Sequence, residues 1–458
     1  MINLSLAELS HALTATLIGE NLTIASVSTD SRAIANGDLF IALKGPNFDA
    51  HQFIDEVISK GAAAVVVDHA IDCAVPQLVV ADTTLALGQV GALVKARLNV
   101  PAVAVTGSVG KTTVKEMMAA IMSRIGNVLA TAGNFNNEIG VPLTLLRLTP
   151  EHQYAVMELG ANHLGEIAYT TSLVKPKVAV ITNVAAAHLE GFGDLFGVAR
   201  AKGEIYTGLV DDGLAIVPFD SEFHSYWLQR LTQLNMYTFG MDAPADYYAE
   251  DVALDEAGCA GFTMVSPQGR RFIQLTLPGK HNIRNALAAA AATLALGASL
   301  TDVQLGLSQM KPVKGRINVY QPKPLLRIID DTYNANSESV KAATDLLASY
   351  GGVRILVLGD MGELGPDARL YHEDVGQYAK DQGINHLFTL GVLSQNASAL
   401  FHAQGAHFSS RQQLVAKLLP FLQQKTEVSI LVKGSRSARM ELVVQDLLES
   451  CQQETSAC

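Results

Sequence analysis

Hydrophobic positions in the middle of the chain alternate between two patterns. Stretches with helical periodicity, such as residues 111–124 and 197–206, separate short runs that are almost wholly apolar. The runs are residues 102–105, 154–158, 178–181 and 214–217. Runs of four or five apolar residues are typical of buried strands, whereas a repeat of three to four residues is typical of helices. This alternation predicts βαβ units on a parallel sheet.

The flanking regions have patterns of their own. Before residue 83, short β-rich segments at residues 22–28, 39–43, 63–67 and 78–80 are separated by Gly, Pro and Asn turns. Residues 247–277 show short alternating strands, which predicts an antiparallel patch. The Ala-rich helix expected at 283–296 should cover the central sheet. After residue 326 the alternation returns, with expected strands at 327–330, 355–358, 386–390 and 430–432 and expected helices at 337–349, 370–381 and 440–449.

The domain organisation is predicted from the chain length and from a segment rich in proline and turn residues. A chain of 458 residues suggests about three domains at roughly 150 residues each. Residues 312–324 contain three prolines and the turn Lys314-Gly315-Arg316, which predicts a linker or hinge. We therefore expect an α/β protein of three domains: a mixed α/β domain (1–83), a central parallel-sheet domain with a phosphate loop and a small antiparallel patch (84–313), and a Rossmann-like domain (314–458).

Composition narrows the class of protein. The chain is 49% hydrophobic and 17% charged, which is typical of a globular protein with real cores. Its net charge of -11 disfavours nucleic acid as a partner, because a phosphate backbone needs a basic surface, but a small phosphorylated ligand needs only a local positive pocket. The four scattered cysteines indicate neither a disulfide framework nor a zinc knuckle. We expect a cytoplasmic monomer without membrane insertion.

The strongest chemical signal is a phosphate-binding loop. The apolar strand ends at Thr106, and the expected helix starts near Lys111. The loop and helix start comprise Gly107, Ser108, Val109, Gly110, Lys111, Thr112 and Thr113. Glycines allow close approach of backbone N–H groups to phosphates, the lysine reaches the β- and γ-phosphates, and a Thr112 hydroxyl can bind Mg²⁺. Only two residues separate the glycines, where the standard P-loop has four, so the short loop narrows the choice of family.

Three further groups follow predicted strands of the central region. They are Glu158, His188 and Lys202. Ligands of open α/β sheets bind at the carboxyl ends of strands, and a carboxylate with an imidazole there could hold Mg²⁺ beside a triphosphate. Each residue alone is more often a cap or a solvated loop residue. Lys202 would suit a metal site only if its amine reacted with CO₂ to form an anionic carbamate, which sequence physics alone would not suggest.

A polar cluster follows the first strand of the third region. Residues 330–336 read Asp-Asp-Thr-Tyr-Asn-Ala-Asn, and a predicted helix begins directly after them. Acidic and amide groups in this position can hold a ribose hydroxyl or a polar substrate. Helix capping by Asn336 or Ser337 explains one of these residues more simply, though hardly all of them.

These segments together resemble the Mur ligase family over essentially the whole chain. The short phosphate loop at 106–113, the segment Ala201-Lys202-Gly203-Glu204-Ile205, and the helix start His281-Asn282-Ile283-Arg284-Asn285 carry the resemblance. Finer likeness to the member that adds D-alanyl-D-alanine lies in residues 134–140, 158–162, 331–336, 358–365 and 432–441. One departure is Ser337, where the family usually has proline, and serine can also start a helix.

The resemblance implies an activity and two cofactors. ATP, with Mg²⁺, would phosphorylate the terminal carboxylate of a UDP-N-acetylmuramoyl-tripeptide, and the amine of D-alanyl-D-alanine would attack the acyl phosphate. A folylpolyglutamate-type or other Mur-type ligase remains an alternative, although the former should lack the segment 28–32. A regulator that merely hydrolyses ATP would need no third domain bearing Asp331 and Asn334.

The resemblance also implies roles for residues. Lys111, Glu158, His188 and Lys202 would be catalytic, with Thr112 and Glu158 on one Mg²⁺ and His188 and carbamylated Lys202 at a second. ATP would also contact His281, Asn282, Asn285, Arg316 and Asp331. The substrates would contact Ser28, Thr29, Asp30, Ser31, Arg32, Lys44, His51, Asn136, Asn137, Asn334 and Asn336, together with the loop 360–365.

Overall fold

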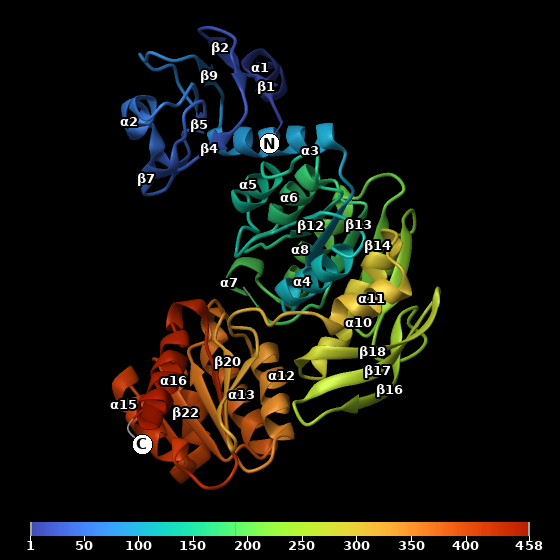
Figure 1. Cartoon of the computed structure of the whole chain (residues 1–458), viewed down its shortest axis with the longest axis vertical. Coiled ribbons are helices and arrows are strands. Elements are labelled where there is room, and N and C mark those ends of the chain that lie inside the picture. The colour runs from blue at the N-terminus through green and yellow to red at the C-terminus, as the bar shows by residue number, and fades with distance from the viewer. Residues whose placement is uncertain (1, 188, 457–458) are drawn as a thin grey trace.

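The computed structural model describes residues 2–187 and 189–456 and shows three regions, each built around its own sheet (Figure 1). The first region lies at the top of Figure 1, the central region to the right, and the third region, with the C-terminus, at the lower left. No helix in the described part of the chain is long and apolar enough to span a membrane.

The first region has a five-stranded sheet. Its strands, in spatial order, are β2 (Thr16–Ile18), β9 (Gln77–Val79), β8 (Ala64–Val67), β5 (Leu39–Ile41) and β4 (Val27–Ser28). Only β2 pairs antiparallel. Smaller elements complete the region: α1 (Leu6–Leu13), α2 (Ile54–Ser59), and the pairs β1 (Leu4–Ser5) with β3 (Thr23–Ile24) and β6 (Lys44–Gly45) with β7 (Phe48–Asp49).

The central sheet is parallel throughout, as the alternation predicts. Its order is β11 (Val128–Ala130), β12 (Tyr154–Glu158), β10 (Ala102–Thr106), β13 (Val178–Ile181), β14 (Leu214–Pro218) and β15 (Asn235–Phe239). The chain adds strands on one side of β10 and then on the other. Such a reversal of strand order opens a crevice at the carboxyl ends of the strands, which is where ligands of α/β sheets bind.

Both faces of the central sheet are buried. Along β10, Ala102 and Ala104 belong to one core and Val103 and Val105 to another, so alternate side chains pack on opposite faces. The first core includes residues of α3 (Thr83–Leu98), α5 (Gly140–Leu145), α6 (Glu166–Val174) and α8 (Leu195–Gly203). The second includes residues of α4 (Lys111–Met122), α10 (His281–Ala295) and α11 (Leu300–Ser308). The Ala-rich helix therefore covers the sheet as expected.

The expected antiparallel patch is confirmed. It consists of β16 (Tyr248–Leu254), β17 (Cys259–Ser266) and β18 (Gly269–Pro278), and its inner side chains join the second core. The patch also touches the third region, because the hydroxyl of Tyr350 donates to the carbonyl of Ala257 at 2.8 Å.

The third region is a six-stranded sheet with helices on both faces (Figure 1). Its order is β19 (Asn318–Lys323), β20 (Leu326–Asp331), β24 (Val428–Lys433), β21 (Val353–Gly359), β22 (His386–Leu390) and β23 (Gly405–Phe408). The main helices are α12 (Ser337–Ser349), α13 (Ala368–Asp381), α15 (Arg411–Leu422) and α16 (Glu441–Ser456). Only β19 runs antiparallel to its neighbour.

The linker expected over residues 312–324 is wrong in its second half. Asn318–Lys323 is the edge strand β19, which pairs with β20. Proline lacks an N–H donor but is tolerated on an edge strand, which accounts for Pro322 within β19. Any hinge between the central and third regions is therefore confined to the irregular residues 310–317.

Candidate functional site

The phosphate loop is fixed by hydrogen bonds to the segment that follows β13. Ser108 Oγ donates to the carbonyl of Ala185 at 3.0 Å, and the N–H of Val109 donates to Asn183 Oδ1 at 2.9 Å. Gly107 has a φ of 151°, and an added Cβ would lie 1.9 Å from Thr182 Oγ1, so this position requires glycine. The loop is thus held in shape by tertiary contacts.

Lys111 begins α4 and points back across the loop. Its ammonium donates to the carbonyl of Gly107 at 2.6 Å. Burial lowers the pKa of Lys111 below its usual value, while the nearby Glu158 carboxylate acts in the opposite direction and Arg316 adds to the lowering. An incoming anion would relieve this unfavourable burial of a cation.

Glu158, the last residue of β12, presents an unpaired carboxylate oxygen. The side chain is 3% exposed, and its Oε1 accepts a hydrogen bond from Asn136 Nδ2 at 2.8 Å. Its buried Oε2 has no hydrogen-bond partner among the described residues. A buried carboxylate oxygen without a donor is costly unless a cation or another donor occupies the site. The arrangement therefore fits a divalent cation beside the phosphate loop.

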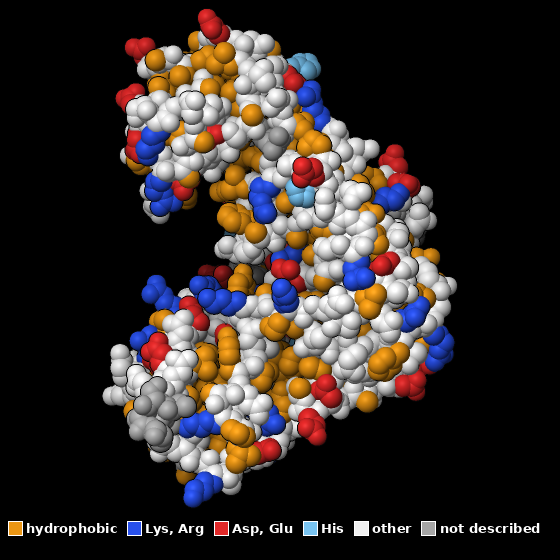
Figure 2. Space-filling model, in the orientation of Figure 1, with side chains coloured by type: hydrophobic (Ala, Val, Ile, Leu, Met, Phe, Trp, Pro, Cys, Tyr) orange, Lys and Arg blue, Asp and Glu red, His pale blue; other side chains and the backbone are white. Residues whose placement is uncertain are grey.

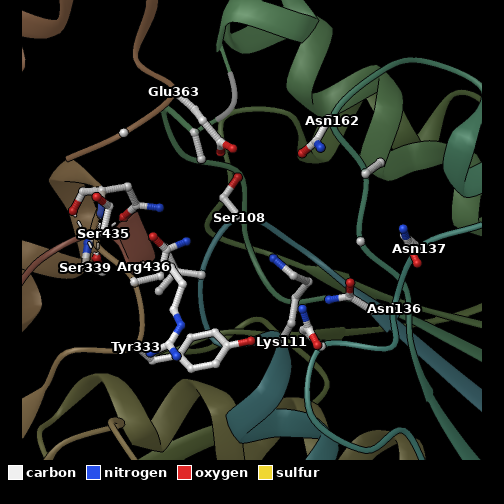
Figure 3. A pocket seen from close by; sticks show the side chains of 18 of the residues that line it. Ser108, Lys111, Asn136, Asn137, Asn162, Tyr333, Ser339, Glu363, Ser435 and Arg436 are labelled. Carbon is white, nitrogen blue, oxygen red and sulfur yellow. Dashed lines mark hydrogen bonds between the residues drawn. The ribbon is translucent and has the colours of Figure 1, made fainter. Parts of the chain in front are cut away.

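These groups line one cleft with residues of the third region. The cleft has a volume of about 560 Å³, and its lining includes Lys111, Asn136, Asn137, Glu158, Arg316, Asn334 and Asn336. Figure 3 shows Lys111 and Asn136 on the central side, facing Ser339 and Ser435 across the opening. The structure thus joins the two sets of residues that the sequence places in separate regions.

A smaller pocket adjoins the loop and shares Gly110 and Arg316 with the cleft. It measures about 60 Å³, and its lining includes Gly110, Thr113, His281, Asn282, Asn285, Arg316 and Asp331. Burial lowers the pKa of His281, which favours its neutral form. The predicted adenine and ribose residues therefore lie together. Arg316 stacks over the ring of Tyr333 at 4.1 Å, and its Nη2 donates to Thr112 Oγ1 at 3.3 Å.

Lys433 is a buried charge to which the sequence analysis assigned no role. Its ammonium contacts Asp331 Oδ2 at 2.5 Å and the carbonyl of Asn334 at 2.9 Å. Lysine at the end of the mostly apolar strand β24 is the signal that could have identified it. This ion pair fixes the turn between β20 and α12, which contributes to both cavities.

The asparagines of the predicted substrate set also have structural roles. Asn336 caps α12, accepting from the N–H of Ser339 at 2.9 Å, and Asn137 Oδ1 accepts from the N–H of Gly140 at 2.9 Å. Capping thus accounts for Asn336, as the simpler interpretation proposed, although both residues still line the cleft.

Lys202 is not among the described residues that line the cleft. Its side chain is buried in α8, with the ammonium 5.2 Å from the centre of the Phe192 ring. Burial, reinforced by the charge of Lys111, lowers the pKa of Lys202 to about 7. The other predicted residue of this group, His188, lies outside the described residues.

The first region holds its predicted substrate residues as exposed ion pairs away from the cleft. Arg32 pairs with Asp30 at 2.8 Å, and this contact lowers the pKa of Asp30 to about 2. Ser28 Oγ accepts from the N–H of Asp30 at 3.2 Å, and the carbonyl of Ser31 accepts from a lysine ammonium. Thr29 lies between these residues in the same turn.

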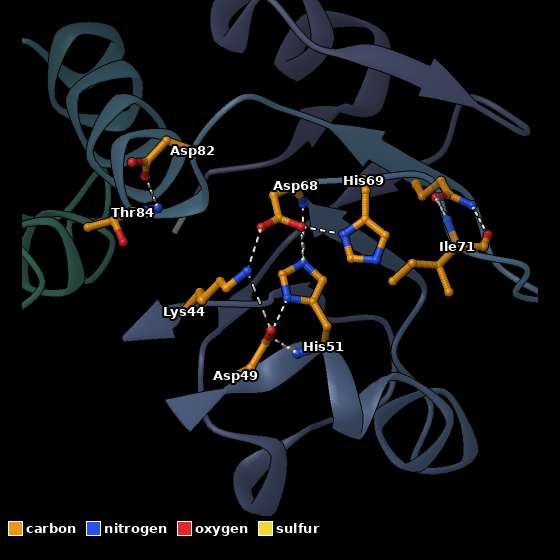
Figure 4. Close-up of polar contacts among 9 residues, drawn as sticks. Lys44, Asp49, His51, Asp68, His69, Ile71, Asp82 and Thr84 are labelled. Atoms are coloured by element: carbon orange, nitrogen blue, oxygen red, sulfur yellow. Dashed lines mark hydrogen bonds and ion pairs between the residues drawn. The ribbon is translucent and has the colours of Figure 1, made fainter. Parts of the chain in front are cut away.

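Lys44 and His51 form a second polar cluster in this region (Figure 4). His51 Nδ1 lies 2.6 Å from Asp49 Oδ1, and Lys44 Nζ lies 3.8 Å from both Asp49 and Asp68. Asp68, His69 and His51 bring three possible metal ligands within 4.8 Å of one another. However, the N–H of Asp68 already donates to His51 Nε2 at 3.2 Å, and Lys44 supplies the cation between the carboxylates.

Comparison with known proteins identifies relatives over the full chain. Family models match as the Mur ligase family catalytic domain (residues 23–125), the Mur ligase middle domain (105–293) and the Mur ligase glutamate ligase domain (315–436). UDP-N-acetylmuramoyl-tripeptide–D-alanyl-D-alanine ligase of Escherichia coli K12 is 46% identical, covering 98% of this chain and 99% of the relative.

Solved structures agree with these matches. MurF from Acinetobacter baumannii superposes with a TM-score of 0.93 at 40% identity, covering 98% of this chain and 99% of that one. MurF ligase from Thermotoga maritima in complex with ADP has a TM-score of 0.83 at 26% identity, covering 94% and 98% of the two chains.

Proposed function

The chain belongs to the Mur ligase family, and from this premise we propose that it joins D-alanyl-D-alanine to UDP-N-acetylmuramoyl-tripeptide with ATP, releasing ADP and phosphate in peptidoglycan precursor synthesis. The observation that carries the proposal is the single cleft shared by the phosphate loop, Glu158 and the third region. Amide ligation through an acyl phosphate needs such a cleft, because the nucleotide, the acceptor carboxylate and the amine must meet at one point.

The first step is transfer of the γ-phosphoryl group to the tripeptide carboxylate. Both reactants are anions, so the site must neutralise charge while it aligns them. Lys111 and the loop N–H groups would bind the phosphates, and His281, Asn282 and Asn285, which line the smaller pocket, would contact the adenine. The Arg316 guanidinium would bind the phosphates, and the Asp331 carboxylate would accept a hydrogen bond from a ribose hydroxyl.

Glu158 and Thr112 would hold Mg²⁺, with the unpaired Oε2 of Glu158 as the best-fitting ligand. When bound, Mg²⁺ neutralises phosphate oxygens and draws electron density from the γ-phosphorus. Thr112 Oγ1 accepts a hydrogen bond from Arg316 in this structure, and its second lone pair remains for a metal ion. Asn136 would keep Glu158 aimed at the site through its hydrogen bond to Oε1.

The second step is attack of the dipeptide amine on the acyl phosphate. The new C–N bond forms a tetrahedral intermediate, which loses phosphate and a proton to give the amide. Asn334 and Asn336 contribute amide groups to the side of the cleft that would receive the dipeptide. Water would hydrolyse the acyl phosphate, so closure of the third region about residues 310–317 would protect it.

Lys202 is suited to carbamate formation. Its pKa of about 7 leaves a large neutral fraction near neutral pH, and only the neutral amine attacks CO₂. The neutral amine attacks the carbon of CO₂, an N–C bond forms as one C–O π bond breaks, and one proton is released. Because the ammonium must first lose a proton to give that amine, two protons leave in all when the buried cation becomes a carbamate anion near Lys111. That anion, with His188, would support a second Mg²⁺ or orient Lys111.

A coupled assay tests the proposed function directly. Phosphate release from ATP should require both UDP-N-acetylmuramoyl-tripeptide and D-alanyl-D-alanine, and mass spectrometry should detect the UDP-linked pentapeptide. Replacing the tripeptide by a folate and the dipeptide by glutamate serves as the control for the folylpolyglutamate alternative. ATP hydrolysis that is independent of either substrate would favour the regulator. Size-exclusion chromatography under assay conditions tests the proposed monomer.

A further inference from the structure

The turn that follows β24 places an arginine and two serines in the cleft. Ser435, Arg436 and Ser437 line it on the third-region side, at the carboxyl end of a parallel strand (Figure 3). We propose that Arg436, assisted by the Ser435 and Ser437 hydroxyls, is the subsite for the terminal carboxylate of the incoming dipeptide. This inference rests on the proposed function.

The distribution of charge in the cleft supports this choice. An incoming D-alanyl-D-alanine keeps its carboxylate as an anion while its amine reacts at the other end. Four glutamates line the cleft and would repel that carboxylate: Glu138, Glu158, Glu166 and Glu363. The basic side chains among the described lining residues are Lys111, His163, Arg316 and Arg436. A charge-assisted contact with the carboxylate would come from one of these four.

Three of the four basic groups are already placed elsewhere. Lys111 crosses the phosphate loop, Arg316 contacts Thr112 and the ring of Tyr333, and His163 pairs with Glu166 at 3.0 Å on the central side. Among these four, Arg436 alone comes from the turn that follows a strand of the third region. In Figure 2, Lys and Arg side chains gather along the edge of the third region that faces the hollow. The approach of an anion to this side is therefore favoured.

Arg436 has spare donors and an oriented guanidinium. Its side chain is 70% exposed, and its Nη1 donates to Glu441 Oε1 at 3.2 Å. A guanidinium has five N–H donors in a planar fork, so one contact leaves enough for a bidentate carboxylate pair. Glu441 then acts as a positioning residue, because its hydrogen bond orients the guanidinium and leaves the other N–H donors for the carboxylate.

The turn itself is held in place. The N–H of Ser435 donates to the carbonyl of Asp360 at 2.9 Å, and the hydroxyls of Ser435 and Ser437 lie 3.0 Å apart. An added Cβ on Gly434 would approach Met440 Cγ to 2.6 Å, so the chain packs tightly just before the arginine. A carboxylate bound at this turn would be held in a fixed position. The second residue of the dipeptide adds about 3.5 Å between that carboxylate and the reacting amine, a length that a single D-alanine lacks.

Paired substrates test the subsite. Initial rates are measured with D-alanyl-D-alanine and with its C-terminal amide, which lacks the negative charge but keeps the reacting amine. For the unaltered enzyme, amidation should lower kcat/KM by roughly 10- to 100-fold, because a charge-assisted bidentate pair is lost. Arg436→Gln should show a similar loss with the dipeptide, mainly in its KM, and little further loss with the amide.

Matched variants make the result specific. Arg436→Lys keeps the charge without the planar fork and should be intermediate. Arg439→Gln alters an exposed arginine on the same turn, outside the cleft lining, and should behave as the unaltered enzyme. The KM values for ATP and the UDP-linked tripeptide, and the melting temperature, should change little in all three. These readouts separate substrate binding from misfolding.

The outcomes are distinct. If Arg436→Gln still prefers the acid over the amide as strongly as the unaltered enzyme, the carboxylate is bound elsewhere and the subsite is wrong. If Arg439→Gln lost the preference for the acid over the amide, the carboxylate subsite would have to be assigned to Arg439 instead. If the unaltered enzyme forms no amide with D-alanyl-D-alanine, the proposed function fails instead of the subsite.

Discussion

The phosphate loop and the first region hold their charged groups in opposite states. Around the loop, Lys111 is partly buried and Glu158 is buried, and one carboxylate oxygen of Glu158 has no donor among the described residues. In the first region, Arg32 is 86% exposed and already paired with Asp30. The first arrangement is organised before the ligand arrives, whereas the second must exchange an internal partner for the ligand. Preorganised charges act on the transition state, and exchangeable ones act on binding.

Removing the Lys111 ammonium from the phosphate loop should have the largest effect on the rate. We expect Lys111→Ala to lower kcat by at least about 10³-fold, because the developing negative charge on the phosphates loses its nearest cation. The variant should not lose thermal stability, since burial of its ammonium is unfavourable. Lys177→Ala, which removes an exposed lysine paired with Asp212, is the control and should keep full activity. Retention of more than about a tenth of kcat would contradict the role given to Lys111.

Lys202→Ala should produce the next largest effect, a loss of roughly 10²-fold with partial rescue. If the carbamate exists, acetate or propionate in the buffer supplies an equivalent carboxylate to the cavity left behind. Lys115→Ala is the matched control: Lys115 is also buried, but its ammonium contacts Glu116 and the carbonyl of Thr131, so a carboxylate should not rescue that variant. Normal activity of Lys202→Ala would rule out the carbamate.

The pH dependence of carbamate formation has a definite sign. The pKa of Lys202 is lowered to about 7, so the ammonium dominates below that pH and the reactive neutral amine above it. In buffer purged of CO₂ and returned to a fixed low CO₂ pressure, activity should rise between pH 6 and 8. Because the unfolded chain binds more protons than the folded one between pH 7 and the usual lysine value, this group should also make the folded state more stable as pH rises through that window.

Sequence patterns predicted the secondary structure around the phosphate loop well but its long-range side-chain contacts poorly. The motif at 106–113 predicted the strand, the glycine turn and the start of α4, because each depends on local chemistry. A lysine at the end of β24 could have drawn attention to Lys433, but neither its pairing with Asp331 nor the unpaired oxygen of Glu158 could be foreseen. Asp331 and Lys433 are far apart in the chain, and only the pairing of β20 with β24 brings them together.

Edge strands were the other limit of the sequence analysis. β19 was interpreted as a linker because prolines flank and interrupt it, and those prolines are compatible with a strand only at an edge. By contrast, α12 matched its predicted residues 337–349, since Asn336 and Ser339 form a capping box that marks its start. Local signals fix helix starts, whereas the place of a strand in its sheet is a property of the whole fold.

Changing the exposed ion pair should have the smallest effect and sharpens the comparison. Arg32→Gln should raise KM for the UDP-linked tripeptide by roughly 3- to 10-fold, as expected for the loss of one charge-assisted contact, with kcat and the KM for ATP unchanged. Arg369→Gln, which removes another exposed arginine with a local carboxylate partner, Glu373, is the control. Because the pKa of Asp30 is about 2, the pair persists throughout the physiological range, and the KM difference should be constant from pH 6 to 8. A fall in kcat instead would show that the first region also contributes to the transition state, and the contrast between the two regions would then be one of degree.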